Sequence, residues 1–289
     1  MTQALTLPAP AKLNLFLHIN GRRSDGYHQL QTVFQLLDAG DDLSFTLGGD
    51  DILCAREWPE LPWEHNLIYR AAILLRQRAG KSLPGVTVDV VKRLPQGGGL
   101  GGGSSNAATT LLALNHLWNL DLSLDELADI GRRLGADVPV FVRGHSAWAE
   151  GVGEQLTAID LPERWYLILH PNCHVSTAQI FAHKDLTRDS ALITVAAFLE
   201  GGGKNDCQTL VSSLFPQVKN AIDWLNQFGE ARLTGTGACV FTAFETAADA
   251  HKALSLVPEI FSGFVARGVN ISPLHQSLPE TKHWGVAKR

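Results

Sequence analysis

The spacing of apolar residues predicts several strands in the first half of the chain. In Val86–Val91 (VTVDVV), β-branched and apolar residues recur at alternate positions with Asp89 interrupting them, which is the pattern of a strand. Apolar segments near 13–19, 31–38 and 42–47 are predicted as three further strands. The first half therefore contains the strands of at least one sheet.

Helical patterns lie between and after these strands. Residues 66–79 (NLIYRAAILLRQRA) form an amphipathic pattern, and Asn106–Trp118 is rich in Ala and Leu, which predicts a buried helix. Ser123 and Glu126 form a capping box that begins another helix, predicted to end at about Leu134.

The second half is predicted to be less regular, with a loop-rich stretch over 183–208. Its predicted elements are strands at 146–150 and 165–169, a helix near 216–228, strands around Thr234–Gly237, a helix at 246–256 and a strand near 263–269. Gly235 and Gly237 are predicted to form a turn between the strand-like segments around them. A boundary near 150–165 predicts two domains, 1–155 and 156–289. The mixture of helices and strands indicates an α+β or α/β fold.

Six glycines in seven positions form the most unusual segment, Gly97–Gly103 (GGGLGGG), which Ser104, Ser105 and Asn106 follow directly. Glycine loses the most backbone entropy on ordering, so an ordered run of glycines needs compensation. A run of free N–H groups that leads into a helix N-terminus is an anion site, most often for phosphate. Ser104 or Ser105 is a candidate N-cap of that helix. A flexible linker is disfavoured, because a strand and a helix flank the run closely.

Two common phosphate-binding templates fit this loop poorly. The Walker A pattern needs a lysine between its last glycine and the following serine or threonine, and here Ser104 follows Gly103 directly. The dinucleotide pattern is met by Gly97, Gly99 and Gly102, but a run so rich in glycine meets it by chance. The dinucleotide-binding fold also requires a strand after the helix, whereas a second helix is predicted here.

A third template is a resemblance to a known family. Residues 95–108 (PQGGGLGGGSSNAA) resemble the phosphate loop of the kinase superfamily of galactokinase, homoserine kinase, mevalonate kinase and phosphomevalonate kinase. Residues 8–15 (PAPAKLNL) and 233–241 (LTGTGACVF) resemble two further motifs of that superfamily. Residues 23–28 (RSDGYH) and 135–141 (GADVPVF) are similar to one branch, whose substrate carries a cytidine diphosphate group.

The resemblance implies a two-domain α+β kinase fold with its active site in the cleft between the domains. It implies an N-terminal domain that binds ATP and a C-terminal domain that contributes to the substrate cleft. ATP and Mg²⁺ are the implied cofactors, with the metal ligands left open. The implied ATP-binding residues are Pro95, Gln96, Gly97, Gly98, Gly99, Leu100, Gly101, Gly102, Gly103, Ser104 and Ser105.

Two residues are implied to be catalytic, and each has a plainer alternative. Asp137 matches the aspartate that takes the proton from the attacking hydroxyl, although its position before Val138 also suits a simple N-cap. Lys12 matches the lysine that stabilises the developing alkoxide, although strand lysines are often solvated. Lys12 is predicted to point away from Leu13 and Leu15, toward the cleft.

The resemblance also implies the substrate-binding residues. Asn14 faces the same side of its strand as Lys12 and is a candidate to bind the diphosphate or the polyol. Tyr27 is implied to stack on the cytosine and His28 to hydrogen-bond it. Phe181 with Thr177 forms the opposite wall, to which Phe34 is a candidate contributor, although Phe34 and Phe181 would otherwise be predicted as core residues.

Composition excludes some classes of binding partner and indicates a cellular location. The 289 residues are 45% hydrophobic and carry a formal net charge of −5, which argues against general nucleic-acid or membrane-surface binding. No apolar run approaches the length of a membrane span, and no signal-peptide core is evident, so a cytoplasmic location is expected. The four dispersed cysteines are expected to be reduced and mostly buried.

The activity implied is phosphorylation by ATP of the 2-hydroxyl of the cytidine diphosphate-bearing erythritol of the non-mevalonate isoprenoid pathway, giving the 2-phosphate and ADP. Two alternatives stay open. One is a related kinase for another small alcohol, such as homoserine or mevalonate. The other is a nucleotide-binding sensor without catalysis, which the presence of both Lys12 and Asp137 disfavours.

Overall fold

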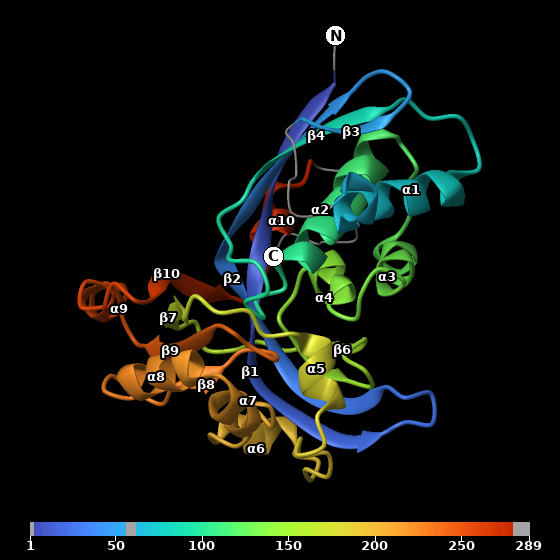
Figure 1. Ribbon diagram of the computed structural model, residues 1–289. Helices are drawn as coiled ribbons and strands as arrows, with labels where there is room; N and C mark the ends of the chain where they lie inside the picture. Colours follow the sequence, from blue (N-terminus) through green and yellow to red (C-terminus); the bar gives the residue numbers. More distant parts are fainter. Residues whose placement is uncertain (1–2, 56–61, 280–289) are drawn as a thin grey trace.

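A long antiparallel hairpin runs through the whole molecule (Figure 1). The computed structural model describes residues 3–55 and 62–279. The hairpin consists of β1 (Ala4–Arg22) and β2 (His28–Leu47), whose pairing shifts register at three places. The predicted strands at 31–38 and 42–47 are one continuous strand. Gly40 makes this possible, because a Cβ there would lie 2.1 Å from the carbonyl oxygen of Ala9 on the paired strand.

The N-terminal half packs helices on one face of this hairpin. The sheet adds β3 (Ile52–Cys54), β4 (Val86–Val91), β5 (Ala147–Glu150) and β6 (Gln155–Ala158). The helices are α1 (Leu67–Ala79), α2 (Gly102–Leu117), α3 (Leu124–Arg132) and α4 (Val138–Arg143), with the 3₁₀ turn η1 (Trp63–His65) before α1. Their apolar faces and the strands form one large buried cluster, in which α2 is central.

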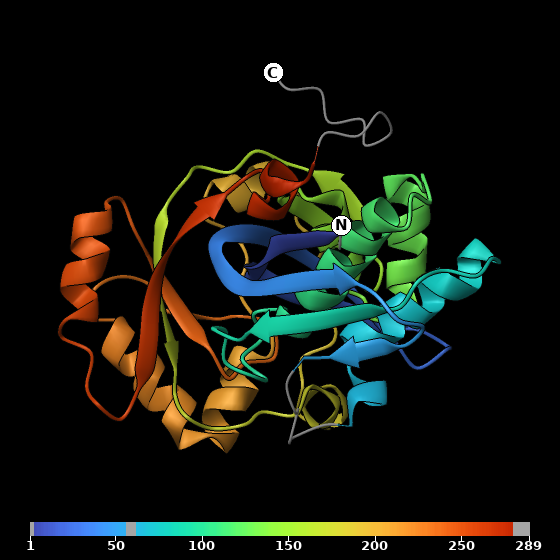
Figure 2. The ribbon, with the colours of Figure 1, turned by 90° about the horizontal axis from the view of Figure 1, so that it is seen from above.

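The C-terminal half extends the same sheet and carries its own helices. Its strands are β7 (Trp165–His170), β8 (Arg232–Leu233), β9 (Val240–Phe244) and β10 (Ser262–Val269). Its helices are α5 (Thr177–Ala182), α6 (Val195–Leu199), α7 (Gln208–Leu214), α8 (Pro216–Leu225), α9 (Ala247–Leu254) and α10 (Pro273–Ser277). Figure 2 shows this half, in orange and red, beside the blue and green N-terminal half.

Strand β10 joins the two halves. Its residues 262–267 pair with β7, and its last two residues pair with Leu36 and Leu37 of β2. The sheet order is β3-β4-β2-β10-β7-β9-β8, with β1 and β5 paired to β2. This arrangement confirms the expected α+β fold. The division into domains 1–155 and 156–289 stays a prediction. The C-terminal α10 packs through Leu274 into the cluster of the N-terminal half.

Most predicted elements are present, and the predicted start of one helix was wrong. Helix α2 begins at Gly102, four residues before the predicted start, because its first turn is built from glycines and serines that carry no helical signal. The predicted glycine turn at Gly235 and Gly237 is present between β8 and β9, whose strand residues lie on either side of Thr234–Gly237. Within residues 3–55 and 62–279, no helix is long and apolar enough to cross a bilayer.

The four cysteines are free thiols, as predicted. Cys207 and Cys239 are buried, whereas Cys54 and Cys173 are partly exposed. Burial raises the pKa of the Cys207 thiol to about 12, so it is an inert core residue.

Candidate active site

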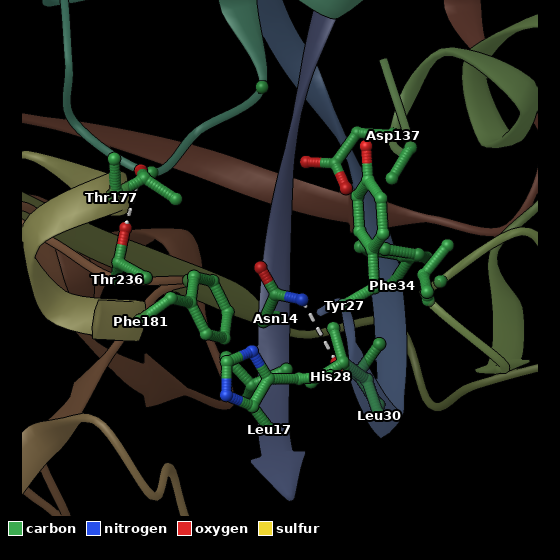
Figure 3. A pocket seen from close by; sticks show the side chains of 18 of the residues that line it. Asn14, Leu17, Tyr27, His28, Leu30, Phe34, Asp137, Thr177, Phe181 and Thr236 are labelled. Atoms are coloured by element: carbon green, nitrogen blue, oxygen red, sulfur yellow. Dashed lines mark hydrogen bonds between the residues drawn. The ribbon is translucent and has the colours of Figure 1, made fainter. Parts of the chain in front are cut away.

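A cavity of about 540 Å³ lies where β1, β2, the glycine loop, α4 and α5 meet (Figure 3). All eight of the predicted substrate-binding and catalytic residues line it together with two glycines of the loop. The predicted residues in its wall are Lys12, Asn14, Tyr27, His28, Phe34, Gly99, Gly101, Asp137, Thr177 and Phe181. Residues up to 169 positions apart in the sequence therefore share one site.

Lys12 lies at the centre of the polar wall. It points into the cavity as predicted, and only 3% of the residue is exposed. Its Nζ donates to Asn14 Oδ1 at 2.5 Å and to the Gly99 carbonyl oxygen at 3.0 Å. It lies 3.2 Å from Asp137 Oδ2 and 5.3 Å from the centre of the Phe34 ring. The alternative of a solvated strand lysine is therefore wrong.

Asp137 occupies the N-cap position of α4, but its side chain makes no capping hydrogen bond. An N-cap side chain accepts from the N–H of N2 or N3, and Pro139 at N2 has no N–H. The carboxylate instead faces the Lys12 ammonium, with 32% of its side chain exposed toward the cavity. The arrangement places a carboxylate and a cation side by side in the wall of the cavity.

The glycine loop adopts backbone angles that would be strained for any other residue. Gly97, Gly99 and Gly101 have φ values of +66°, +74° and +72°. A Cβ on Gly99 would lie 2.2 Å from the Thr234 carbonyl oxygen, and one on Gly98 would lie 2.6 Å from Cys239 Sγ. Both the backbone angles and the close packing therefore require glycine.

The carbonyl groups of this loop point into the protein. Gly97 and Gly98 accept from the N–H groups of Ala238 and Cys239, and Leu100 accepts from the N–H of Lys12. Within the described residues, the N–H groups from Gly99 to Ser104 donate to no acceptor of the chain. The first turn of α2 adds its own unpaired N–H groups and the positive end of the helix dipole. The loop therefore has the features of an anion-binding site.

Neither serine of the predicted pair is the N-cap of α2. Gly101 takes that position in the left-handed conformation, so Ser104 and Ser105 lie inside the first turn. Ser104 is partly exposed, whereas Ser105 is fully buried and its Oγ has no hydrogen-bond partner among the described residues. Ser104 therefore has the more accessible of the two hydroxyl groups.

The turn between β8 and β9 supports both the loop and the polar wall. Thr234 Oγ1 accepts from the backbone N–H of Asn14 at 3.0 Å and donates to the Gly99 carbonyl oxygen at 3.2 Å. Thr236 Oγ1 lies 2.8 Å from Thr177 Oγ1 of α5, a contact that Figure 3 shows as a dashed line. This turn therefore lies beside the glycine loop.

An aromatic group forms the other end of the cavity. His28 is buried and stacks on Phe181, with ring centres 5.1 Å apart and an interplanar angle of 28°. Phe181 therefore contacts His28 instead of facing it across a gap, as an opposite wall would. Tyr27 is 65% exposed at the cavity rim, so its ring is free to cover a ligand.

Comparisons with known proteins agree with this geometry. The family models for the GHMP kinases N terminal domain and the GHMP kinases C terminal match residues 66–145 and 184–262. A Marinobacter nauticus protein named 4-diphosphocytidyl-2-C-methyl-D-erythritol kinase is 55% identical and covers 98% of this chain and 100% of its own. A Pseudomonas putida protein of the same name is 57% identical over 96% of each chain. The chain belongs to the GHMP kinases.

Solved structures of GHMP kinases have the same fold. The crystal structure of a 4-(cytidine 5'-diphospho)-2C-methyl-D-erythritol kinase is 31% identical, covers 92% of this chain and 100% of its own, and has a TM-score of 0.82. The mevalonate kinase of Methanococcus jannaschii has a TM-score of 0.68 at 17% identity over 93% and 99% of the two chains, which shows the fold alone. The chain is thus a kinase whose phosphate donor is ATP.

Sequence reasoning missed three polar residues of this GHMP kinase site. Thr32 Oγ1 accepts from Asn14 Nδ2 at 2.9 Å and so orients the amide beside Lys12. Thr236 bonds Thr177, and Arg188 bonds His28 from a loop. Thr32 faces β1 across the hairpin, so strand pairing could have indicated it. Arg188 lies in the loop-rich stretch and has no local signal.

Electrostatics keep His28 neutral. Burial lowers its pKa below the usual range, and the positive charges of Arg188 and Arg22 lower the pKa further. A neutral imidazole can stack on Phe181 and still offer one N–H donor.

Proposed function

We propose that this chain transfers the γ-phosphoryl group of ATP to the 2-hydroxyl of 4-diphosphocytidyl-2-C-methyl-D-erythritol and releases the 2-phosphate and ADP. The observation that carries the proposal is the Lys12–Asp137 pair, 3.2 Å apart, in a cavity bounded by the glycine loop. The relatives with 55–57% identity that carry this name support the substrate.

Asp137 and Lys12 divide the work at the acceptor. Asp137 accepts the proton of the attacking hydroxyl, and Lys12 stabilises the negative charge that develops on the oxygen. Asn14 holds the lysine through its Oδ1 and is itself held by Thr32. The phosphoryl-transfer transition state is loose and needs little early deprotonation, so positioning contributes most of the catalysis.

The glycine loop supplies the other half of the site. ATP brings the phosphoryl group, and residues 95–105 bind its phosphates through the unpaired N–H groups. Mg²⁺ is proposed to enter with the triphosphate, since Mg²⁺ in kinases is held largely by phosphates, with Ser104 as a candidate contact. Gly99 and Gly101 lie in the cavity wall, so the donor site adjoins the acceptor site.

The aromatic end of the cavity is proposed to take the cytosine. Tyr27 covers the base, His28 donates a hydrogen bond to it, and Phe181 supports His28 from behind. Thr177 and Phe34 close the sides of the cavity. We further propose a cytoplasmic location, which suits an ATP-dependent enzyme with four free thiols.

The test is ADP release with the purified protein, ATP, Mg²⁺ and the cytidylyl alcohol. We expect release with this substrate, competition by CMP or CDP, and none with homoserine or mevalonate. Asp137→Asn should remove most of the turnover, whereas Asp129→Asn, on the exposed face of α3, should leave it unchanged. Release with mevalonate or homoserine would favour a related kinase, and full activity of Asp137→Asn would refute the catalytic assignment.

A further inference from the structure

Arg188 ties the loop after α5 to the first residue of β2. Its Nε donates to His28 Nε2 at 3.0 Å. Its Nη1 donates to the Leu186 carbonyl oxygen at 3.0 Å, and its Nη2 donates to the carbonyl oxygens of Phe181 and His183 at 3.0 and 2.7 Å. One side chain therefore holds both partners of the His28–Phe181 stack.

The direction of the first bond determines the protonation of His28. A guanidinium has five N–H donors and no lone pair, so the imidazole nitrogen that it contacts must be an acceptor. His28 Nε2 is therefore unprotonated, and in the neutral ring the proton is on Nδ1. Within the described residues, His28 Nδ1 has no hydrogen-bond partner, and His28 lines the cavity.

The charges around His28 oppose a second proton. Arg188 and Arg22 are the charged groups that act on it, and both are positive. Burial beside Phe181 lowers the pKa of His28 more than these charges do, since a charged imidazole loses solvation there. Both effects favour the neutral ring, which has one N–H donor and no charge.

We propose that Arg188 is a positioning residue that fixes His28 as the neutral Nδ1–H tautomer, so that the cavity offers one N–H donor to its ligand. A ligand at this end must then present an acceptor atom, such as the ring nitrogen or carbonyl oxygen of a heteroaromatic base. Only the identity of that ligand rests on the proposed function, in which cytosine supplies both kinds of acceptor. Arg188 contacts neither Lys12 nor Asp137, so its effect is on binding.

The tautomer can be measured without substrate. In protein labelled with ¹⁵N at histidine, protonated and unprotonated ring nitrogens have well-separated chemical shifts, and His28→Gln assigns one of the 11 histidines. We expect wild-type His28 to have Nδ1 protonated and Nε2 unprotonated. A wild-type spectrum with Nε2 protonated would overturn the proposal, whether or not any variant folds.

Arg188→Met tests the cause. We expect a mixture of the two tautomers and a rise in the pKa of His28 toward its ordinary value. Arg132→Met, an exposed arginine of α3, is the matched control and should change neither quantity. If Arg188→Met is folded, by the unchanged signals of the other histidines, and His28 keeps its single tautomer, then Arg188 does not fix it.

Kinetics distinguish this proposal from the proposed function. Loss of a fixed donor is worth about one hydrogen bond, so the KM of Arg188→Met for the cytidylyl alcohol should rise about tenfold while kcat changes little. A fall in kcat with an unchanged KM would refute the binding role. If the wild type shows the tautomer but no activity on the cytidylyl alcohol, the proposed function fails and the role of Arg188 stands.

Discussion

Two glycines of the same run are expected to respond in opposite ways to one added methyl group. Gly99 has a φ of +74°, and a Cβ there would lie 2.2 Å from the Thr234 carbonyl oxygen and 3.1 Å from that of Gly237. Gly103 lies in the first turn of α2, and its Cβ would meet only Leu67 Cδ1, at 3.5 Å. Gly99→Ala should destabilise the protein, and Gly103→Ala should not.

The magnitude follows from the contacts. A left-handed backbone costs a non-glycine residue about 1–2 kcal/mol. A Cβ at 2.2 Å from a backbone oxygen forces the loop away from Thr234. That movement weakens the bonds from Thr234 Oγ1 and Lys12 Nζ to the Gly99 carbonyl oxygen, at about 1 kcal/mol each. The total loss for Gly99→Ala is about 3–4 kcal/mol. Gly103→Ala should gain up to about 1 kcal/mol through helix propensity.

The assay is urea unfolding followed by circular dichroism, with both variants and the wild type at one pH. The expected midpoint falls for Gly99→Ala and rises slightly or stays constant for Gly103→Ala, at equal slopes. Equal midpoints for the two variants would show that the loop is not held against the Thr234 turn. Such a result would refute the packing argument for the whole glycine run.

Four further predictions follow from individual contacts. Lys12→Met should lower kcat for ADP release by about 10²–10³-fold, as expected when one group that stabilises transition-state charge is removed, and a loss under threefold would contradict its role. His28 has a lowered pKa, so its contribution to stability is complete above its unfolded pKa of about 6.5 and is lost as the pH falls through the folded pKa. The urea midpoint should therefore fall between pH 7 and 5 more steeply for the wild type than for His28→Gln. Parallel profiles of the two proteins would refute this. Thr177→Val removes the bond to Thr236 and should raise the KM for the alcohol, with an unchanged KM speaking against a role for α5 in the cavity. Asp41→Asn should lower the free energy of unfolding by about 1–3 kcal/mol. The buried carboxylate accepts hydrogen bonds from two backbone N–H groups just before the glycine loop and pairs with a lysine. An unaltered unfolding midpoint would show that these contacts are dispensable.

Local signals predicted the regular elements well. The capping box at Ser123 is present, with both of its hydrogen bonds, and begins α3. The apolar alternation of Val86–Val91 is strand β4 to the residue. The start of α2 could not be predicted, because Gly102 and Gly103 are helical only through their neighbours. The turn after β8 was predicted from Gly235 and Gly237, whereas its hydrogen bonds to the glycine loop join distant segments that local spacing does not relate.

The candidate site was predicted in its parts but not in its connections. Strand periodicity placed Lys12 and Asn14 on one face, and the cavity contains both. The sequence contained an argument against a capping hydrogen bond from Asp137, because Pro139 lacks the N–H that such a bond would use. No spacing rule indicates that Arg188 reaches His28 across 160 positions.

The sequence by itself determined which residues form strands, which begin helices, and where the backbone must be glycine, because these depend on neighbours within a few positions. The tertiary structure alone decided what those residues do together. Three contacts join distant segments: the ion pair of Lys12 with Asp137, the contact of Gly99 with Thr234, and the hydrogen bond from Arg188 to His28. Such contacts depend on how the strands pair and on which face is buried, and periodicity along the chain carries no information about either partner.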